Sequence, residues 1–375
     1  MTNQQSAIGN LQSAYRPWLH RYACLLVVAT FILVASGGNV TSRDAGLAVP
    51  DGFTVYGHFL WTFPVEKWVG NVFHEHIHRL KGSVVGLMCI ALVIWLWRTQ
   101  RHRPWLGRLS LAVLALVIVQ GIMGGLRVEF VNWFSALATP FAILHGITGQ
   151  VFLCMTVLVA AATSRLWIEH ACDSRSRLSR GSQSLRRLTL VLLVVLLIQL
   201  SLGAAMRHTG SGLAIPDFPA SYGQLVPPLS PQAITEAHDA LVPYDEFDGD
   251  VYPTPAQVGV HFAHRVWSLV VLGVSGYLLT RLAYAFGRHR LLVGPILALA
   301  ALLIVQLALG AAVIWMGRHP DVATAHQATG AAILATAALL TFRVYRVSRI
   351  GPTRDPVPFA APMPAPGARV EVIGT

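Results

Sequence analysis

The sequence has few charged residues and few cysteines for its length. Of its 375 residues, 12% are charged and 54% are hydrophobic, whereas a soluble domain carries roughly 25% charged residues. This shortage excludes an ordinary water-soluble surface. The apolar residues instead form blocks of about 20 residues, the length of helix that crosses the hydrocarbon core of a bilayer. In lipid such a block must be helical, because a helix satisfies its own backbone hydrogen bonds.

Eight such blocks predict an all-α polytopic membrane protein with eight transmembrane helices. We place the spans at residues 20–41, 71–97, 104–126, 138–163, 186–207, 256–282, 291–315 and 322–346. The first block is long and is followed directly by motif residues, so we expect it to be retained rather than cleaved as a signal peptide.

The basic residues give the orientation of these spans. The net charge of +11 could suggest a nucleic-acid partner, but the Arg clusters follow the second, fourth, sixth and eighth spans, as in cytoplasmic connections of membrane proteins. The longest connection on the opposite side, 208–257, has no Lys or Arg. We therefore expect no nucleic-acid partner and cytoplasmic N- and C-termini.

The four cysteines are not placed to form a structural disulfide. They lie in predicted spans or in the inner connection, away from the outer face where disulfides persist; they are Cys24, Cys89, Cys154 and Cys172. Residues 351–375 are rich in Pro and Ala and predict a disordered tail.

The chain contains an internal repeat of about 180 residues, equal to four spans. Residues 46–51 (GLAVPD) match residues 212–217 (GLAIPD), and a Tyr-Gly pair follows each at the same spacing. In the second span, residues 75–79 (EHIHR) align with residues 261–265 (HFAHR) of the sixth. Four spans are an even number, so both copies have the same orientation. We expect two tandem four-helix bundles related by a pseudo-twofold axis along the membrane normal.

This repeat divides the chain into an N-terminal half, 1–165, and a C-terminal half, 186–350. A cytoplasmic linker, 166–185, joins them, and the tail follows at 351–375. Each half contains one pair of intramembrane histidines at similar depth, His78 with His145 and His264 with His326.

Two imidazoles that face each other across a bundle suit a six-coordinate haem iron. Haem is favoured over a bare metal ion, because each half offers two histidines and no cysteine or second carboxylate for a zinc or copper site. The alternative for any one intramembrane histidine is a hydrogen bond to a neighbouring helix.

Several other residues near the histidine pairs have open roles. Arg79 and Arg265 could pair with haem propionates or extend to the membrane interface. Asp51 and Asp217 are typical turn residues, and their loops could also cap a haem. A further group of histidines is expected at or outside the interface, solvated or hydrogen-bonded in loops: His58, His74, His76 and His208.

Glu75 is the clearest difference between the two copies. It lies three residues before His78, so on a helix both project from one face. The second copy has His261 at this place, which leaves open whether His261 or His264 is the iron ligand, although the alignment favours His264. A carboxylate beside one haem only would separate a reacting site from an electron-transfer site. The alternative is a buried glutamate paired with an arginine.

In combination, these motifs resemble the haem A synthase family of bacterial and mitochondrial inner membranes, over about residues 20–346. The resemblance implies oxidation of the C8 methyl of haem o to a formyl group, giving haem a for a terminal oxidase. It implies a substrate haem between His78 and His145 with Glu75 catalytic, and a haem b between His264 and His326. Some members carry a cysteine pair in outer loops, which this chain lacks.

The same resemblance implies a bacterial inner-membrane location and several partners: haem o synthase, a farnesyltransferase; cytochrome oxidase assembly; and a membrane electron acceptor. It also allows a homo-oligomer. One rival is a dihaem b-type electron carrier that leaves the ring unoxidised. A second rival is a secondary transporter, for which duplicated bundles are common, but here the ionisable residues lie near the outer end rather than at mid-membrane.

Overall fold

The computed structural model describes residues 15–169, 181–241, 252–287 and 289–347. Most of the predicted linker, Cys172 and the whole predicted tail lie outside these residues. The described part is helical and contains isolated β-bridges but no strand. The prediction of an all-α protein is therefore confirmed.

Among the described residues, eight helices are long and apolar enough to cross a membrane, which confirms the predicted number of spans. They are α2 (Pro17–Ser42), α3 (Gly70–Thr99), α4 (Pro104–Trp133), α5 (Ser135–Thr163), α7 (Gly181–His208), α9 (Pro255–Phe286), α10 (Val293–Trp315) and α11 (Pro320–Val347). The connections add two short helices, α6 (Arg165–Glu169) and α8 (Pro231–Asp239), and three 3-10 turns, η1 (Leu60–Thr62), η2 (Val65–Lys67) and η3 (Ser211–Leu213).

Most helix ends agree with the sequence to within a few residues, but α4 continues well past the predicted end at 126, to Trp133. The charged residues Arg127 and Glu129 lower the hydropathy there and made the span appear to end. In the structure Glu129 accepts a hydrogen bond from the Gly52 backbone N–H at 3.0 Å, so this turn contacts the first outer loop. Proline begins several helices, including α2 and α4. It is tolerated there because the N–H groups of the first helical turn have no hydrogen-bond partner within the helix.

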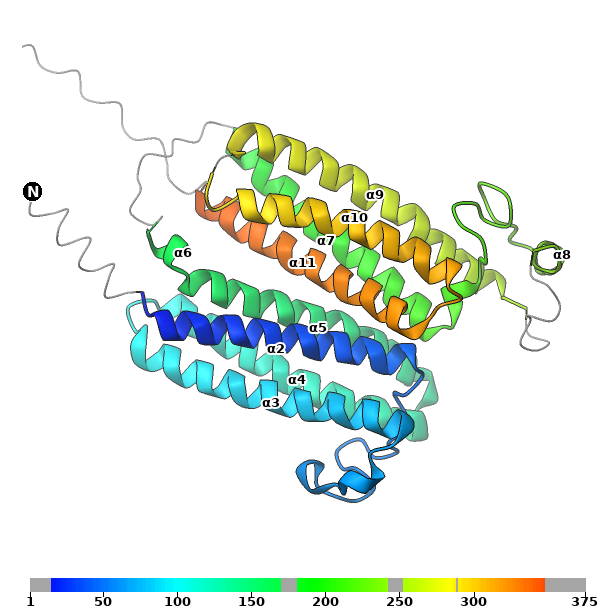
Figure 1. Ribbon diagram of the computed structural model, residues 1–375, viewed down its shortest axis with the longest axis horizontal. Coiled ribbons are helices and arrows are strands. Elements are labelled where there is room, and N and C mark those ends of the chain that lie inside the picture. The colour runs from blue at the N-terminus through cyan, green and yellow to red at the C-terminus, as the bar shows by residue number, and fades with distance from the viewer. Residues whose placement is uncertain (1–14, 170–180, 242–251, 288, 348–375) are drawn as a thin grey trace, which may run out of the picture.

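The helices lie side by side in two groups, α2 to α5 and α7 with α9 to α11 (Figure 1). Within the groups, α2 packs on α3, α4 on α5, α7 on α9 and α10 on α11. The groups meet where α2 and α5 contact α11, and where α5 contacts α7. A pseudo-twofold axis and the division of the chain at 165 and 186 stay predictions.

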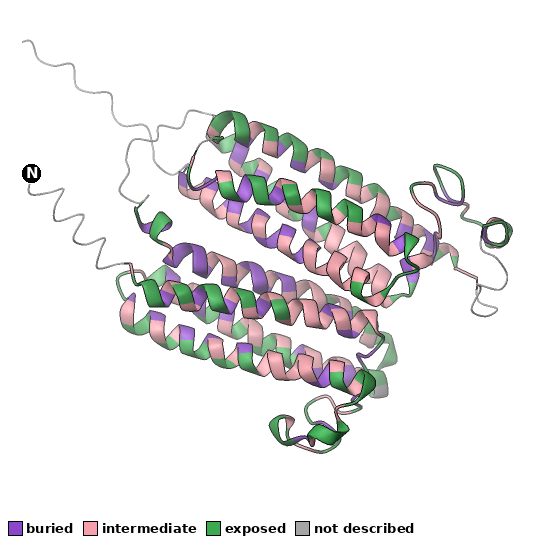
Figure 2. Ribbon diagram, in the orientation of Figure 1, coloured by how far each residue is buried: buried purple, intermediate pink, exposed green. Residues whose placement is uncertain are grey.

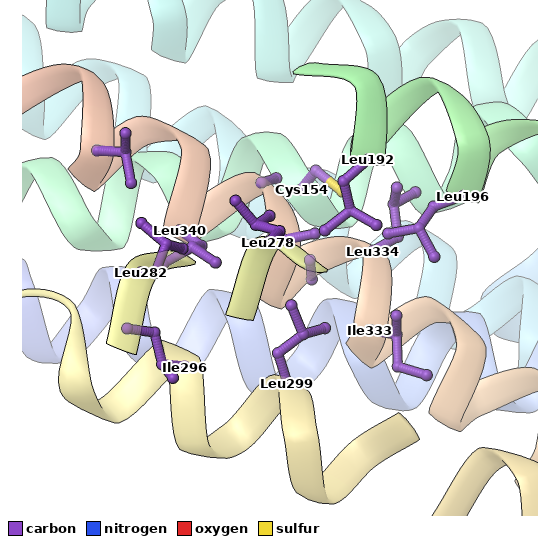
Figure 3. Packing of buried hydrophobic residues seen from close by; sticks show 14 of the residues in the cluster. Cys154, Leu192, Leu196, Leu278, Leu282, Ile296, Leu299, Ile333, Leu334 and Leu340 are labelled. Carbon is purple, nitrogen blue, oxygen red and sulfur yellow. The ribbon is translucent and has the colours of Figure 1, made fainter. Parts of the chain in front are cut away.

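Each group of helices has its own buried core, and the core of the second group also includes Leu153 and Cys154 of α5. In α11, 61% of the most apolar window is buried, against 22% in α9 and α10, and Figure 2 shows the outward faces of several helices as exposed. The central helix is rich in Ala and Gly, which allow helices to approach closely in a membrane. Cys154 of α5 lies among Leu192, Leu278 and Leu334 of the other group (Figure 3). Cys24, Cys89 and Cys154 are free thiols.

A half-buried arginine joins the two groups near their outer ends. Arg207, one residue before the end of α7, donates from Nη2 to the Gly38 carbonyl at 2.6 Å and to the Ser42 hydroxyl at 2.7 Å. Both acceptors lie in the last turns of α2, where a cation is favourable because of the helix dipole. Thr324 of α11 donates to the same hydroxyl at 3.1 Å, so three helices from both groups meet at Ser42.

Replacing Arg207 with Met should weaken this junction, because two charge-assisted hydrogen bonds are lost. We expect destabilisation by about 2 kcal/mol and a lower thermal unfolding midpoint of the purified protein in detergent. The matched control is Arg187→Met, at an exposed position of the same helix, which should leave the midpoint unchanged. Equal midpoints for Arg207→Met and the unaltered chain would contradict a stabilising role.

Candidate haem-binding sites

The second group of helices brings two of the predicted ligand histidines face to face. His264 of α9 and His326 of α11 have ring centroids 6.5 Å apart, with the ring planes at 67°. Imidazole nitrogens bind metal ions at about 2 Å, so two rings on opposite sides of one metal have centroids roughly 6 Å apart. The observed separation therefore fits a shared iron without a large backbone movement. In the first group, His78 lies on α3 and His145 on α5.

Each of the four histidines lies over a glycine of a neighbouring helix. A Cβ atom built on Gly37 or Gly203 would lie 2.9 Å or 3.1 Å from the Cε1 atom of His78 or His264, respectively. The other pair is similar, because Cβ atoms on Gly124 and Gly310 would lie 3.5 Å and 3.2 Å from the Cε1 atoms of His145 and His326. These four glycines occupy matching positions in the repeat. In both groups, therefore, the missing glycine side chain leaves space for a histidine ring.

Polar side chains orient the rings. Ser36 Oγ lies 3.0 Å from His78 Nδ1, which allows that nitrogen to carry the proton and leaves Nε2 free as a metal ligand. In the second group, Gln199 Nε2 lies 3.2 Å from His264 Nε2, and Gln306 Nε2 lies 3.3 Å from His326 Nε2. Sequence reasoning gave these polar residues no role, although Gln306 recurs in the repeat as Gln120.

Some buried polar atoms at these sites have no partner among the described residues. They are the Nδ1 atoms of His145 and His326 and the Oε1 atoms of Gln199 and Gln306. Buried polar atoms are normally hydrogen-bonded, so unpaired atoms around two facing imidazoles fit a site that is completed by a group outside the protein. The described residues contain no cluster of three or more His, Cys, Asp or Glu side chains for a bare metal ion.

A cavity of about 140 Å³ lies around the histidine pair of the second group. Its walls come from α7, α9, α10 and α11, and it is lined mainly by apolar side chains with His264, His326 and Arg265 among them. Cofactor sites of this kind combine an apolar wall with a few fixed polar groups. The donor set and the wall therefore suit a large, flat, apolar macrocycle with polar ends.

Glu75 and Arg79 fasten the first outer loop to α3. The Glu75 side chain is buried, and its two oxygens accept from Arg79 Nη2 at 2.6 Å and from the Val49 backbone N–H at 2.8 Å. Arg79 Nη1 donates to the carbonyl oxygens of Asp51 at 2.7 Å and Thr54 at 3.0 Å. The alternative that the sequence left open for Glu75, a buried pair with an arginine, is thus present.

The second outer loop is held at the matching positions. Arg265 donates to the carbonyl oxygens of Ile215 at 3.0 Å and Ala220 at 2.9 Å. His261 lies where Glu75 lies in the first group, with the Ile215 N–H 3.2 Å from Nδ1 and Arg265 Nε 3.1 Å from Nε2. A neutral imidazole accepts at one nitrogen only, whereas the Glu75 carboxylate accepts at both oxygens. The donors that face His261 thus belong to the second outer loop and to Arg265, whereas His264 faces His326 across the bundle.

The two loops have the same local structure. The Asp51 carboxylate accepts from the Gly57 N–H at 2.7 Å, and Asp217 accepts from the Gly223 N–H at 2.8 Å. The preceding tyrosines, Tyr56 and Tyr222, have positive φ angles and donate to the carbonyl oxygens of Ala48 and Ala214. The turn role of both aspartates is therefore present, and the capping role stays a prediction.

The expectation of a solvated or hydrogen-bonded His76 is wrong. Its side chain is completely buried, and neither ring nitrogen has a partner among the described residues. Phe63 and Trp68, beside the turns η1 and η2, lie over the ring with centroids at 5.2 Å and 4.6 Å. His76 aligns with Phe262 in the repeat, so it serves as an aromatic packing residue. His58, His74 and His208 are half-buried.

A family model described as cytochrome oxidase assembly protein matches residues 52–338. The chain belongs to this family. Curated relatives named Heme A synthase are similar over most of their length. The protein from Methylobacterium radiotolerans is 26% identical over 88% of this chain and 90% of its own. The protein from Methylorubrum populi is 26% identical over 94% of this chain and 91% of its own. The protein from Shewanella oneidensis is 25% identical over 88% of this chain and 97% of its own.

Replacing Asp51 with Ala should loosen the first outer loop, because the Gly57 N–H and the Thr54 hydroxyl lose their acceptor. A loss of about 1 kcal/mol corresponds to amide exchange roughly fivefold faster at residues 52–57. The same two hydrogen bonds lower the pKa of the Asp51 carboxyl. Their contribution is therefore complete above about pH 4 and declines as the pH falls below it.

The matched control is Asp217→Ala, which removes the equivalent acceptor from the second loop. It should increase exchange near Gly223 and leave residues 52–57 unchanged. Unaltered exchange at 52–57 in Asp51→Ala would show that the carboxylate does not hold the loop.

Proposed function

We propose that this protein is a haem A synthase, an oxidoreductase that converts the C8 methyl group of haem o to a formyl group. The observation that carries the proposal is the duplicated pair of histidines, each over a glycine, in a chain of the cytochrome oxidase assembly family. The names of the curated relatives support the same activity.

In this proposal the two halves hold different haems. His78 and His145 hold the substrate haem o in the first half, and His264 and His326 hold a haem b in the second. A bound haem supplies an iron centre that can exchange electrons. Arg79 and Arg265 would pair with propionates through the N–H groups that the loop carbonyls leave free.

Glu75 is the proposed catalytic residue. It precedes His78 by three residues on α3, so both project from one side of the helix. Arg79 and the Val49 N–H hold its carboxylate in a fixed position, and the loop that they fasten covers this end of the helix. A carboxylate held in this way can accept the proton released when the methyl group is oxidised.

The decisive variant is Glu75→His, because it copies the residue that the second half uses at this position. It keeps a nitrogen acceptor for the Val49 N–H or for Arg79 and removes the carboxylate. We expect it to bind haem o but to form haem a at least about a hundredfold more slowly, the usual contribution of a proton-transfer group. Mass analysis of the haems extracted from the purified protein measures the conversion.

A matched control is His261→Glu, which places a carboxylate in the second half and leaves Glu75 unchanged. Conversion should persist in this variant. Conversion of haem o at the unaltered rate by Glu75→His would show that Glu75 only holds the loop, and absence of haem a from the unaltered protein would overturn the proposed activity.

The second candidate is a dihaem b-type electron carrier. The observation that favours it is the likeness of the two loop attachments, in which an arginine and an acceptor at matching positions bind the loop backbone in both halves. It predicts that only haem b is extracted and that Glu75 is dispensable, so the experiment above separates the two functions.

The eight apolar helices indicate a multi-pass membrane protein. We further propose a bacterial inner-membrane location with both termini in the cytoplasm. Haem o synthase would supply the substrate, cytochrome oxidase assembly would use the product, and a membrane acceptor would take the electrons. A homo-oligomer stays compatible with this proposal.

Replacing Gly203 with Ala should weaken haem binding in the second half. The added Cβ would lie 3.1 Å from His264 Cε1, so the ring must move away from its present position. We expect about tenfold weaker haem b retention, as for other changes that misorient a metal ligand. Haem content by pyridine haemochrome spectra measures the loss. Gly273→Ala, where a Cβ meets nothing within 4 Å, is the control, and equal haem content in both variants would contradict the prediction.

A further inference from the structure

The first half contains a cation near its histidine pair, in addition to Arg79. Arg127 lies on α4 three residues after Gly124, the glycine under His145, so it projects from the same side of the helix. Its guanidinium lies directly against the first outer loop, because a Cβ on Gly46 would be 2.7 Å from Nη2. The matching residue of the second half is Val313.

Arg127 has no fixed partner in the described part of the chain, where no carbonyl or carboxylate accepts a hydrogen bond from it. Its charge interacts electrostatically with Glu75, His78 and His145. The Glu75 oxygens accept from Arg79 and from the Val49 N–H, and neither accepts a hydrogen bond from Arg127. A half-buried guanidinium without an acceptor is costly in a membrane and is usually functional.

The other half of the chain brings a second polar group to the same place. His208, the last residue of α7, is half-buried and interacts electrostatically with Arg127 and His145. Its counterpart at the end of α2 is Ser42, whose hydroxyl is taken by Arg207 and Thr324. At the aligned positions the second half thus has Val313 and Ser42, while a different arginine, Arg318, lies against its matching loop glycine, Gly212.

The position of Arg127 along the helix suits the edge of a haem rather than its iron. Arg127 is six residues from the outer end of α4, and His145 is ten residues from the outer end of α5. At 1.5 Å per residue, the arginine is roughly 6 Å further out than the histidine. The anionic groups of a haem are the propionates at one edge of its ring, so a cation displaced in this way from the ligand histidines could reach them.

We propose that Arg127, assisted by a ring N–H of His208, binds a propionate of the substrate haem at the outer end of the first site. This inference rests on the proposed function, because it assumes that haem o occupies this half. The planar guanidinium forms paired hydrogen bonds with a carboxylate. The pair Arg127 and His208 thus makes the first site selective for a haem with free propionates.

The test compares binding of haem o with binding of its dimethyl ester, in which both propionates are blocked. The full chain, with its second-half haem in place, is titrated with each compound and followed by absorbance. The unaltered protein should bind the free acid at least about tenfold more tightly than the ester, the value of one charge-assisted hydrogen bond. Arg127→Gln should lose this preference and bind the ester as before.

Two further variants separate charge from folding. Arg127→Lys should keep part of the preference, because the charge remains without the paired geometry. Arg108→Gln, at an exposed position near the opposite end of α4, should keep all of it. Equal haem b content in every variant shows that the second half is intact.

The outcomes distinguish this inference from the function on which it rests. A full preference for the free acid in Arg127→Gln, or none in the unaltered protein, overturns the propionate assignment alone and leaves Arg127 as a support for the Gly46 backbone. Failure of the unaltered protein to bind haem o in a manner that depends on His78 and His145 overturns the proposed function as well.

Discussion

Both candidate sites depend on the hydrogen bonds between an arginine and an outer loop. The arginine directly follows the ligand histidine in α3 and in α9. Arg79 and Arg265 donate to carbonyl oxygens of their outer loops, 25 to 50 residues away in the chain. Such loops carry backbone groups that hydrocarbon cannot satisfy, and the guanidinium supplies several donors in a fixed arrangement. In each half the arginine therefore holds the outer loop over the end of its helix. The position of the loop in turn sets which loop residues lie near the histidines.

The two halves share this scaffold and differ in charge. A carboxylate accepts both donors in the first half, whereas the imidazole at the same position can accept one of them. An arginine and a histidine lie near the first pair of ligands, where the second half has Val313 and Ser42. Charges in a low-dielectric site interact strongly, so these few exchanges change the chemistry available to each half while the helices, glycines and loop turns stay the same.

The end of α7 serves both halves at once. Arg207 binds the last turns of α2 and so joins the two groups of helices. The next residue, His208, interacts electrostatically with Arg127 of the first group. The buried interface of α5 and α11 provides the area of contact, while this short segment provides the polar contacts at its outer end. In our proposal a residue of the second half helps to form the first site, which would give a physical reason for the two bundles to be carried on one chain.

The sequence by itself determined the eight spans, the repeat and the four candidate ligand histidines, because helix-length apolar runs and matching motifs are local properties. It did not determine the end of α4, where Arg127 and Glu129 interrupt the apolar run; the helix continues because both residues contact a distant loop rather than lipid. It also misplaced His76, which the loop residues Phe63 and Trp68 bury. The Glu75–Arg79 pair was visible as a spacing of four residues, but its role in holding Val49, Asp51 and Thr54 was decided only when the loop folded back on α3. Contacts between segments far apart in the chain leave no periodic signal, so tertiary structure alone could reveal them.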